Sequence, residues 1–161
     1  MIILVTGTPG TGKTSLAKAL AKELKHKYLD VNTVIKKFKL IESYDNEREC
    51  NVIDENKLKV ILRNIAKEHK NLIIDSHLSH YLAKSYVKHC IVTKCTLKEL
   101  KKRLLKRKYN KEKIQENLQA EIFDICLVEA TENKHNVTIV DTTVDSPTKL
   151  AKLLKNEIKK T

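Results

Sequence analysis

The amino-acid sequence predicts an α/β fold, in which a mostly parallel sheet is covered by helices on both faces. Short apolar runs rich in β-branched residues alternate with segments whose apolar residues recur at helical spacing, and this alternation is typical of parallel sheets. All three glycines, at positions 7, 10 and 12, fall in one loop after the first apolar run. The 161 residues suffice for one ordinary hydrophobic core, so we predict a single domain over residues 1–161.

Five short runs are candidate strands. They span residues 2–6, 27–31, 71–75, 89–93 and 137–141. More than half of the residues in these runs are Ile, Leu or Val, as expected for strands that are buried on both faces of a sheet. Residues 40–53 are polar and acidic, and their pattern predicts neither a helix nor a strand.

Helices are predicted between these strands, over residues 14–24, 32–38, 55–69, 97–108 and 110–130, and from residue 147 to the C-terminus. Residues with short polar side chains stand before several of them, and such residues favour the N-cap position. The predicted caps are Asn32, Asp54, Thr96 and Asn110. Thr96 and Glu99 also have the spacing of a capping box.

Basic residues dominate the charge of the chain. Thirty-two Lys and Arg against twenty Asp and Glu give a net charge of +12, which attracts polyanions such as RNA or a nucleotide. A lysine-rich composition is also typical of heat-adapted proteins. The charge alone therefore leaves both interpretations open.

Cysteine spacing and hydropathy exclude several classes of protein. The four cysteines, at 50, 90, 95 and 126, form no Cys-x-x-Cys pair, so neither a redox motif nor a zinc site is indicated. Apolar runs are too short to span a membrane, and residues 1–6 lack the charged start of a signal peptide. We expect a soluble, cytoplasmic protein with no membrane partner.

The glycine-rich loop carries the strongest functional signal. Residues 7–14, Gly-Thr-Pro-Gly-Thr-Gly-Lys-Thr, match the phosphate-binding pattern G-x-x-x-x-G-K-[ST], with a strand before it and a helix after it. Glycines let successive amides turn inward around a phosphate, and the helix start adds its partial positive charge. The pattern predicts a nucleoside triphosphate site of a P-loop NTPase, with Lys13 on the β- and γ-phosphates and the Thr14 hydroxyl on Mg²⁺.

Two further residues are expected at the same edge of the sheet. Asp75 ends the run at 72–75, and the carboxyl ends of parallel strands meet at one edge. Its carboxylate is a candidate for the magnesium shell, and a turn-forming aspartate is the alternative. His77 can contact the attacking group or order a water molecule, or it is an ordinary surface histidine.

A basic helix supplies candidate arginines. Nine of the sixteen residues from 98 to 113 are basic, and Arg103 and Arg107 lie four apart on one helical face. Guanidinium groups stabilise phosphoryl oxygens during transfer, so this pair is a candidate lid. A solvated basic helix or an RNA-facing patch is the alternative. Asp54 and Glu55 can bind a base, a ribose or Mg²⁺, but helix capping explains them equally well.

Taken together, these motifs resemble the adenylate kinase isoenzyme 6 family, whose members are small adenylate kinase-like ATPases that act in maturation of the small ribosomal subunit. The resemblance covers nearly the whole chain. It is carried by the phosphate loop, residues 49–55, Asp75-Ser76-His77 and, above all, residues 107–123. Departures from the family pattern are Asn51 in place of a proline, Ser76 in place of an aromatic residue, and Leu78 in place of a glycine.

The resemblance implies a three-layer P-loop NTPase of the nucleoside monophosphate kinase type. It implies that ATP and Mg²⁺ are bound with the phosphates on Gly10, Gly12, Lys13, Thr14 and Ser15. It also implies a monophosphate-binding segment at about residues 31–54 and a short lid at about residues 106–116, with Arg107 on ATP. Asp75 and His77 match a second nucleotide-handling motif of the family.

The acceptor site is less well defined by the resemblance. Asp54 and Arg48 are the candidates for binding the monophosphate. Arg48 is the arginine nearest to a position that can clamp an AMP phosphate, with Lys36 and Lys37 as substitutes.

Three functions are compatible with these patterns. The first is a nucleoside monophosphate kinase, which converts ATP and AMP to two ADP and also hydrolyses ATP. The second is an ATPase assembly factor that binds the platform protein of the small ribosomal subunit and rRNA. The third, a small-metabolite kinase of the shikimate or gluconate type, fits the length and the loop but not residues 107–123.

Overall fold

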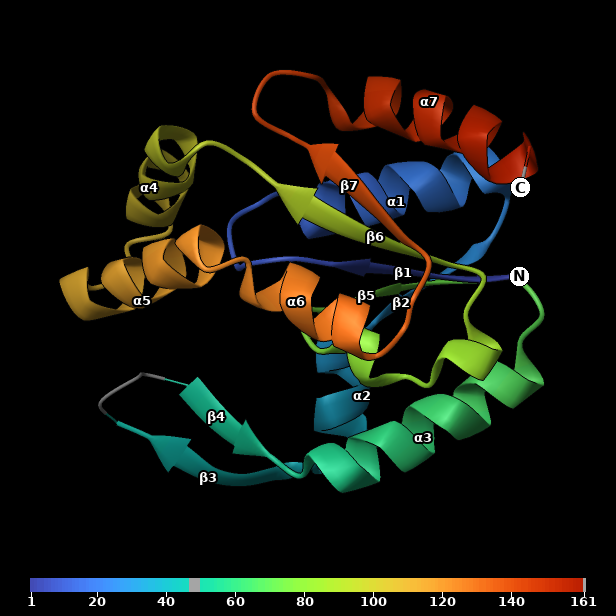
Figure 1. Ribbon diagram of the computed structural model, residues 1–161. Helices are drawn as coiled ribbons and strands as arrows, with labels where there is room; N and C mark the ends of the chain where they lie inside the picture. The colour runs from blue at the N-terminus through green and yellow to red at the C-terminus, as the bar shows by residue number, and fades with distance from the viewer. Residues whose placement is uncertain (47–49, 161) are drawn as a thin grey trace.

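A five-stranded parallel sheet forms the centre of the molecule (Figure 1). The computed structural model describes residues 1–46 and 50–160. The strands lie in the order β2-β5-β1-β6-β7, and every neighbouring pair is parallel. They span Ile2–Thr6 (β1), Lys27–Asp30 (β2), Leu72–Asp75 (β5), His89–Lys94 (β6) and Val137–Asp141 (β7). All five predicted strands are therefore present.

Helices cover both faces of this sheet, which confirms the predicted three-layer α/β class. On one face, α1 (Lys13–Leu24) and α7 (Pro147–Lys160) pack against the sheet side chains Ile3, Val5 and Ile73. On the other face lie α2 (Val31–Lys37), α3 (Glu55–Glu68) and α6 (Ile125–Glu132), as Figure 1 shows. Two short 3₁₀ helices, η1 (Ser79–Tyr81) and η2 (Lys84–Tyr86), complete this second layer.

Two additions project beyond the carboxyl ends of the strands (Figure 1). Helices α4 (Leu97–Lys106) and α5 (Lys111–Ile122) form a pair with its own small core of Cys95, Leu100, Leu104 and Ile114. Strands β3 (Ile41–Asp45) and β4 (Cys50–Ile53) form an antiparallel hairpin. This hairpin occupies the segment for which the sequence pattern predicted neither a helix nor a strand.

The predicted long helix over residues 110–130 is wrong. It divides into α5 and α6 at Asp124, whose φ of 55° is left-handed and ends the helical path. An ion pair between Lys94 and Asp124 ties this break to the end of β6. The division turns α5 away toward α4, while α6 stays on the sheet.

One predicted cap, Asn32, and the predicted capping box at Thr96 and Glu99 differ from the structure. Asp30 caps α2, because its side chain accepts a hydrogen bond of 2.8 Å from the Asn32 amide; Asn32 lies inside the helix. The capping box at α4 is half formed. The Thr96 hydroxyl accepts a hydrogen bond from the Glu99 amide at 3.4 Å, but the Glu99 carboxylate accepts from the Arg103 guanidinium and not from the Thr96 amide.

Within the described residues, no helix has the length and apolar character needed to cross a membrane.

Helix α3 offers a direct test of the core. Leu62 is 0% exposed, whereas Val60 on the same helix is 47% exposed. Leu62→Ala should lower the free energy of unfolding by about 3 kcal/mol, because it deletes buried methyl groups and leaves a cavity. Val60→Ala should change it by less than about 1 kcal/mol. Urea denaturation of both variants measures the difference, and equal losses would contradict the placement of α3 on the sheet.

Candidate active site

The phosphate loop, residues 7–12, connects β1 to α1 and depends on glycine at two points. Gly7 has a φ of +139°, and a Cβ atom there would lie 2.4 Å from the carbonyl oxygen of Thr93. Gly12 caps α1 with a φ of 89°. Both backbone angles are strained for residues with side chains. The loop can therefore approach β6 closely and turn into the helix with its amides directed inward.

Threonine side chains hold this loop against the ends of β6 and β7. The Thr11 hydroxyl donates to the Thr8 carbonyl at 2.7 Å and lies 2.7 Å from the Thr93 hydroxyl. The Thr142 hydroxyl, just after β7, donates to the Thr11 carbonyl at 2.6 Å. Because Thr11 and Thr93 are fully buried, these bonds are shielded from competition by water.

Lys13, the first residue of α1, lies over the loop. Its ammonium group donates to the Thr8 carbonyl at 3.0 Å. Burial, with a smaller contribution from the nearby charge of Arg107, lowers the pKa of Lys13 to about 8, although Cys126 and Asp75 act to raise it. Most of the Lys13 side chains therefore remain protonated at neutral pH, and an approaching phosphate favours the charged form.

Two cavities meet at this loop. A cavity of about 530 Å³ is lined by the loop, α4 and residues 142–147, and another of about 670 Å³ is lined by the loop, the end of β5 and α5. Gly10, Gly12, Ser15 and Arg107 line both cavities. Lys13, Thr14, Asp75 and His77 line the second cavity. The predicted phosphate-binding and catalytic residues thus line two cavities that share the phosphate loop and Arg107.

Asp75 and His77 differ in their surroundings. Asp75 ends β5 and is 3% exposed, with one carboxylate oxygen accepting a hydrogen bond of 2.9 Å from the Tyr28 hydroxyl. The His77 side chain is exposed at the cavity. Desolvation by the cavity walls and the charge of Lys13 lower the pKa of His77 below its ordinary value of 6.5. The imidazole is therefore neutral at physiological pH and has one nitrogen that can accept a proton.

The oxygen donors at this position suit Mg²⁺. The Thr14 hydroxyl and the Asp75 carboxylate line the same cavity, and Mg²⁺ prefers oxygen ligands, usually one or two protein groups together with substrate phosphates and water. Across residues 1–46 and 50–160, no group of three or more His, Cys, Asp or Glu side chains is arranged to hold a metal ion. The residues present fit a metal that is bound together with the nucleotide.

Arg103 and Arg107 have separate environments, although both lie toward the end of α4. The Arg103 guanidinium donates to the Glu99 carboxylate at 3.0 Å and to the Thr142 hydroxyl and carbonyl at 3.1 and 2.7 Å. These bonds fix Arg103 to the end of β7. Arg107 is the C-cap of α4 and lines both cavities, so its guanidinium is the better placed of the two to reach a ligand.

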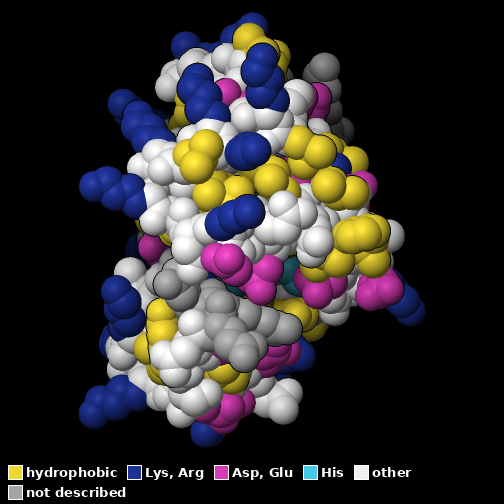
Figure 2. Space-filling view, turned by 90° about the vertical axis from the view of Figure 1, so that its left-hand side faces the viewer, with side chains coloured by type: hydrophobic (Ala, Val, Ile, Leu, Met, Phe, Trp, Pro, Cys, Tyr) yellow, Lys and Arg dark blue, Asp and Glu magenta, His cyan; other side chains and the backbone are white. Residues whose placement is uncertain are grey.

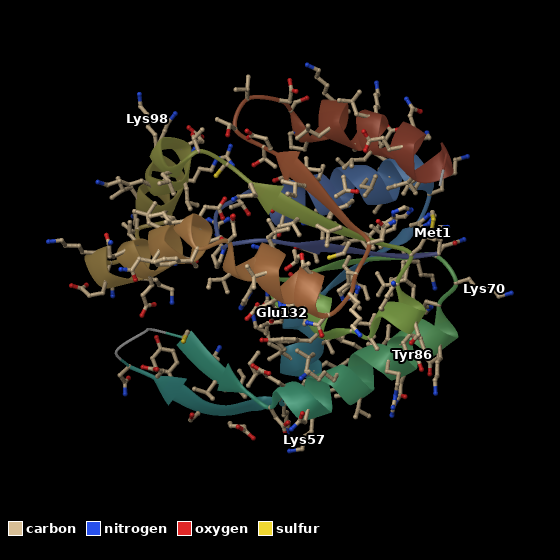
Figure 3. All side chains as sticks on the ribbon, in the orientation of Figure 1. Met1, Lys57, Lys70, Tyr86, Lys98 and Glu132 are labelled. Atoms are coloured by element: carbon tan, nitrogen blue, oxygen red, sulfur yellow. The ribbon has the colours of Figure 1, made fainter. Side chains whose placement is uncertain are left out.

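The predicted acceptor residues are less clearly placed. Asp54 caps α3 through the Lys57 amide at 2.9 Å and forms an ion pair with Lys57 at 2.7 Å, and it is not among the residues lining either cavity. Figure 3 shows Lys57 at the start of α3, on the outside of the molecule. Arg48 lies outside the described residues. The monophosphate role of Asp54 and Arg48 stays a prediction.

Several cavity residues lie in segments that the resemblance pointed to, but the sequence analysis gave them no individual role. Helix α5 contributes Lys113, Glu116, Asn117 and Ala120 to the larger cavity, and their spacing of three, four and seven places them on one helical face. That spacing could have indicated from the sequence that these four side chains face one site. Asn32 from α2 and Cys50 from the hairpin complete the opposite wall.

Comparisons with known proteins place this chain in a family. The family model described as "AAA domain" matches residues 3–124. A protein of Methanocaldococcus jannaschii named "Putative adenylate kinase" is 41% identical over 143 residues, which cover 89% of this chain and 77% of the relative. A protein of the same name from Thermococcus kodakarensis is 39% identical over 160 residues, which cover 99% of this chain and 86% of the relative.

Solved structures share the fold. Shikimate kinase from Acinetobacter baumannii in complex with shikimate matches with a TM-score of 0.70 at 15% identity, over 99% of this chain and 93% of that one. Deoxyadenosine kinase from M. mycoides with bound dATP matches with a TM-score of 0.64 at 14% identity, over 99% of this chain and 100% of that one. At these identities the likeness shows the P-loop kinase fold alone. The sequence relatives carry the assignment further: the chain belongs to the adenylate kinase-like family of these archaeal proteins.

Proposed function

We propose that this protein is a nucleoside monophosphate kinase that transfers the γ-phosphoryl group of ATP to AMP and also hydrolyses ATP. The observation that carries this proposal is the pair of cavities that share the phosphate loop and Arg107. A kinase of this type needs a donor and an acceptor on either side of one transferring group. The family relationship to proteins named as adenylate kinases supports AMP as the acceptor.

The loop and Lys13 bind the donor phosphates in this proposal. The amides at the start of α1 donate to phosphate oxygens at the positive end of the helix, and the Lys13 ammonium neutralises charge on the β- and γ-phosphates. Thr14 and Asp75 would hold Mg²⁺. When bound, the metal ion neutralises charge on the phosphates. No covalent intermediate is required, because positioning and charge neutralisation supply the catalysis.

The acceptor occupies the larger cavity, between the β3–β4 hairpin and α5. Residues 31–54 form the monophosphate-binding segment and residues 106–116 the lid, both as parts of one domain. Arg107 stabilises the equatorial oxygens of the transferring group, because it lines both cavities. His77 faces the acceptor side and holds a water molecule in line with the γ-phosphate when ATP is hydrolysed.

A second candidate function is a role in assembly of the small ribosomal subunit. The resemblance to the adenylate kinase isoenzyme 6 family supports it, with the platform protein and rRNA as partners. The basic face of the molecule supports contact with RNA: Figure 2 shows Lys and Arg side chains crowding the upper half of the side that carries α4, and the net charge is +12. ATP hydrolysis would then release the partner.

The decisive experiment is a coupled assay of ATP turnover with the purified protein. It compares AMP, other nucleoside monophosphates, shikimate, and water alone as acceptors, with and without the ribosomal platform protein. The kinase is supported if ADP forms at twice the rate of ATP loss when AMP is the acceptor and the platform protein is absent. Turnover of shikimate, or turnover only with the platform protein, would replace the proposal with the corresponding alternative.

Removing Lys13 should abolish both reactions. Lys13→Ala should lower AMP phosphorylation and ATP hydrolysis by about 100-fold or more, because both need the same bound triphosphate and lose the same charge stabilisation. Lys22→Ala, an exposed position on the same helix, is the control. Retention of either activity by the Lys13 variant would refute the shared site.

Arg107 should act mainly in the transition state. Arg107→Ala should lower kcat more than it raises the KM for ATP, because a guanidinium at the border of both cavities makes its best contacts as charge redistributes. Steady-state kinetics measure both parameters, with the exposed Arg63→Ala on α3 as the control. A change in KM alone would assign Arg107 to ground-state binding.

His77 and Asp75 should separate hydrolysis from transfer. His77→Ala should reduce ATP hydrolysis by about 10-fold or more and AMP phosphorylation by less, because water needs an ordering group and bound AMP does not. Asp75→Asn should reduce both reactions, because neither proceeds without the metal. Both rates are measured at saturating Mg²⁺, with His69→Ala at the end of α3 as the control. Equal losses in both reactions for His77→Ala would contradict its assignment to hydrolysis.

A further inference from the structure

Tyr28 lies beside the proposed metal site but was not predicted from the sequence. On β2 it stands opposite Ile73 of β5, and Asp75 follows Ile73 by two residues on the same face of the sheet. Asp75 is therefore a diagonal neighbour of Tyr28, within reach of a long aromatic side chain. The ring packs against the side-chain cluster beneath α1, with the Lys18 ammonium 5.5 Å from its centroid.

The phenol contacts one of the two proposed metal ligands directly. Its hydroxyl donates to the Asp75 carboxylate at 2.9 Å, and Thr14, the second proposed ligand, lines the same cavity as Asp75. A tyrosine hydroxyl has an ordinary pKa of about 10, so the phenol keeps its proton and can donate to the carboxylate throughout the physiological pH range.

A buried carboxylate needs such a partner to keep one orientation. Asp75 is 3% exposed, so few water molecules can compete for its oxygens. An oxygen that accepts from Tyr28 is fixed in direction, and the rotation of the whole carboxylate group is fixed with it. Groups that hydrogen bond to metal ligands in this way set the geometry and the affinity of a metal site.

We infer that Tyr28 is a positioning residue: its phenol holds the Asp75 carboxylate beside Thr14, so that both oxygen ligands for Mg²⁺ are in place when the nucleotide binds. This inference rests on the proposed function, because Asp75 and Thr14 are its proposed magnesium ligands. The alternative is that Tyr28 serves the core alone, through the packing of its ring. Phenylalanine at this position separates the two, because it keeps the ring and lacks the donor.

The test measures binding without turnover. The Kd of a non-hydrolysable ATP analogue is determined by calorimetry in EDTA and again in saturating Mg²⁺, for the natural protein, Tyr28→Phe and Tyr86→Phe. Tyr86 lies on η2, on the side of the molecule opposite α4 and α5 (Figure 3), and its substitution controls for loss of a phenol elsewhere. The enhancement of affinity by Mg²⁺ is the readout.

Tyr28→Phe should bind the analogue normally in EDTA and lose about 10-fold of the enhancement by Mg²⁺, the usual scale for a partner of a metal ligand. Tyr86→Phe should match the natural protein in both conditions. An undiminished enhancement in Tyr28→Phe would overturn the inference, and so would equal weakening with and without Mg²⁺, which would indicate a packing role. A natural protein whose affinity ignores Mg²⁺ would overturn the proposed metal site itself.

A double-mutant cycle provides a second measurement. In an Asp75→Asn background, adding Tyr28→Phe should cause no further loss of the Mg²⁺ enhancement, because the phenol acts through that carboxylate. Additive losses would show that Tyr28 acts by another route. Thermal unfolding of each variant, recorded in EDTA, separates any loss of fold from loss of the metal site.

Discussion

The arrangement of the candidate site depends on how the phosphate loop is held against the strand ends. Glycine provides the backbone angles, but the threonine hydroxyls at positions 11, 93 and 142 keep the loop in one conformation. They link β1, β6 and β7 at a single edge of the sheet. Because these bonds are buried, the amides are oriented in advance, and binding a phosphate need not order the loop. Arg103 extends the same network to α4 through Thr142.

This network gives the two arginines of α4 different roles despite their equivalent spacing. Arg103 donates three hydrogen bonds to protein groups, so it sets the angle between α4 and the sheet. Arg107, one turn later, ends the helix and faces both cavities. One arginine thus anchors the basic helix while the other remains available to a ligand. A charge count along the helix cannot distinguish these roles, because both residues occupy one helical face.

The elements that the sequence predicts well are those governed by local pattern. Buried parallel strands are continuous apolar runs, and the phosphate loop carries its glycines at fixed spacing, so both were predicted at nearly their observed bounds. The break at Asp124 was missed because it is tied to Lys94, thirty residues away. Tyr28 was missed because its contact with Asp75 requires β2 and β5 to be neighbours. The hairpin was missed because its strands are mostly exposed and lack apolar alternation.

That exposure has a consequence for how stability is distributed. The described residues of β3 and β4 pair with each other in a sheet of two strands, apart from the central sheet. Ribbons of two strands are only marginally stable by themselves in water, and exposed backbone hydrogen bonds open with a low free energy. Amide protons of the hairpin should therefore exchange with deuterium through local opening, long before those of β1 and β5. The wall of the larger cavity to which Cys50 contributes should thus open more readily than the central sheet on which the phosphate loop stands.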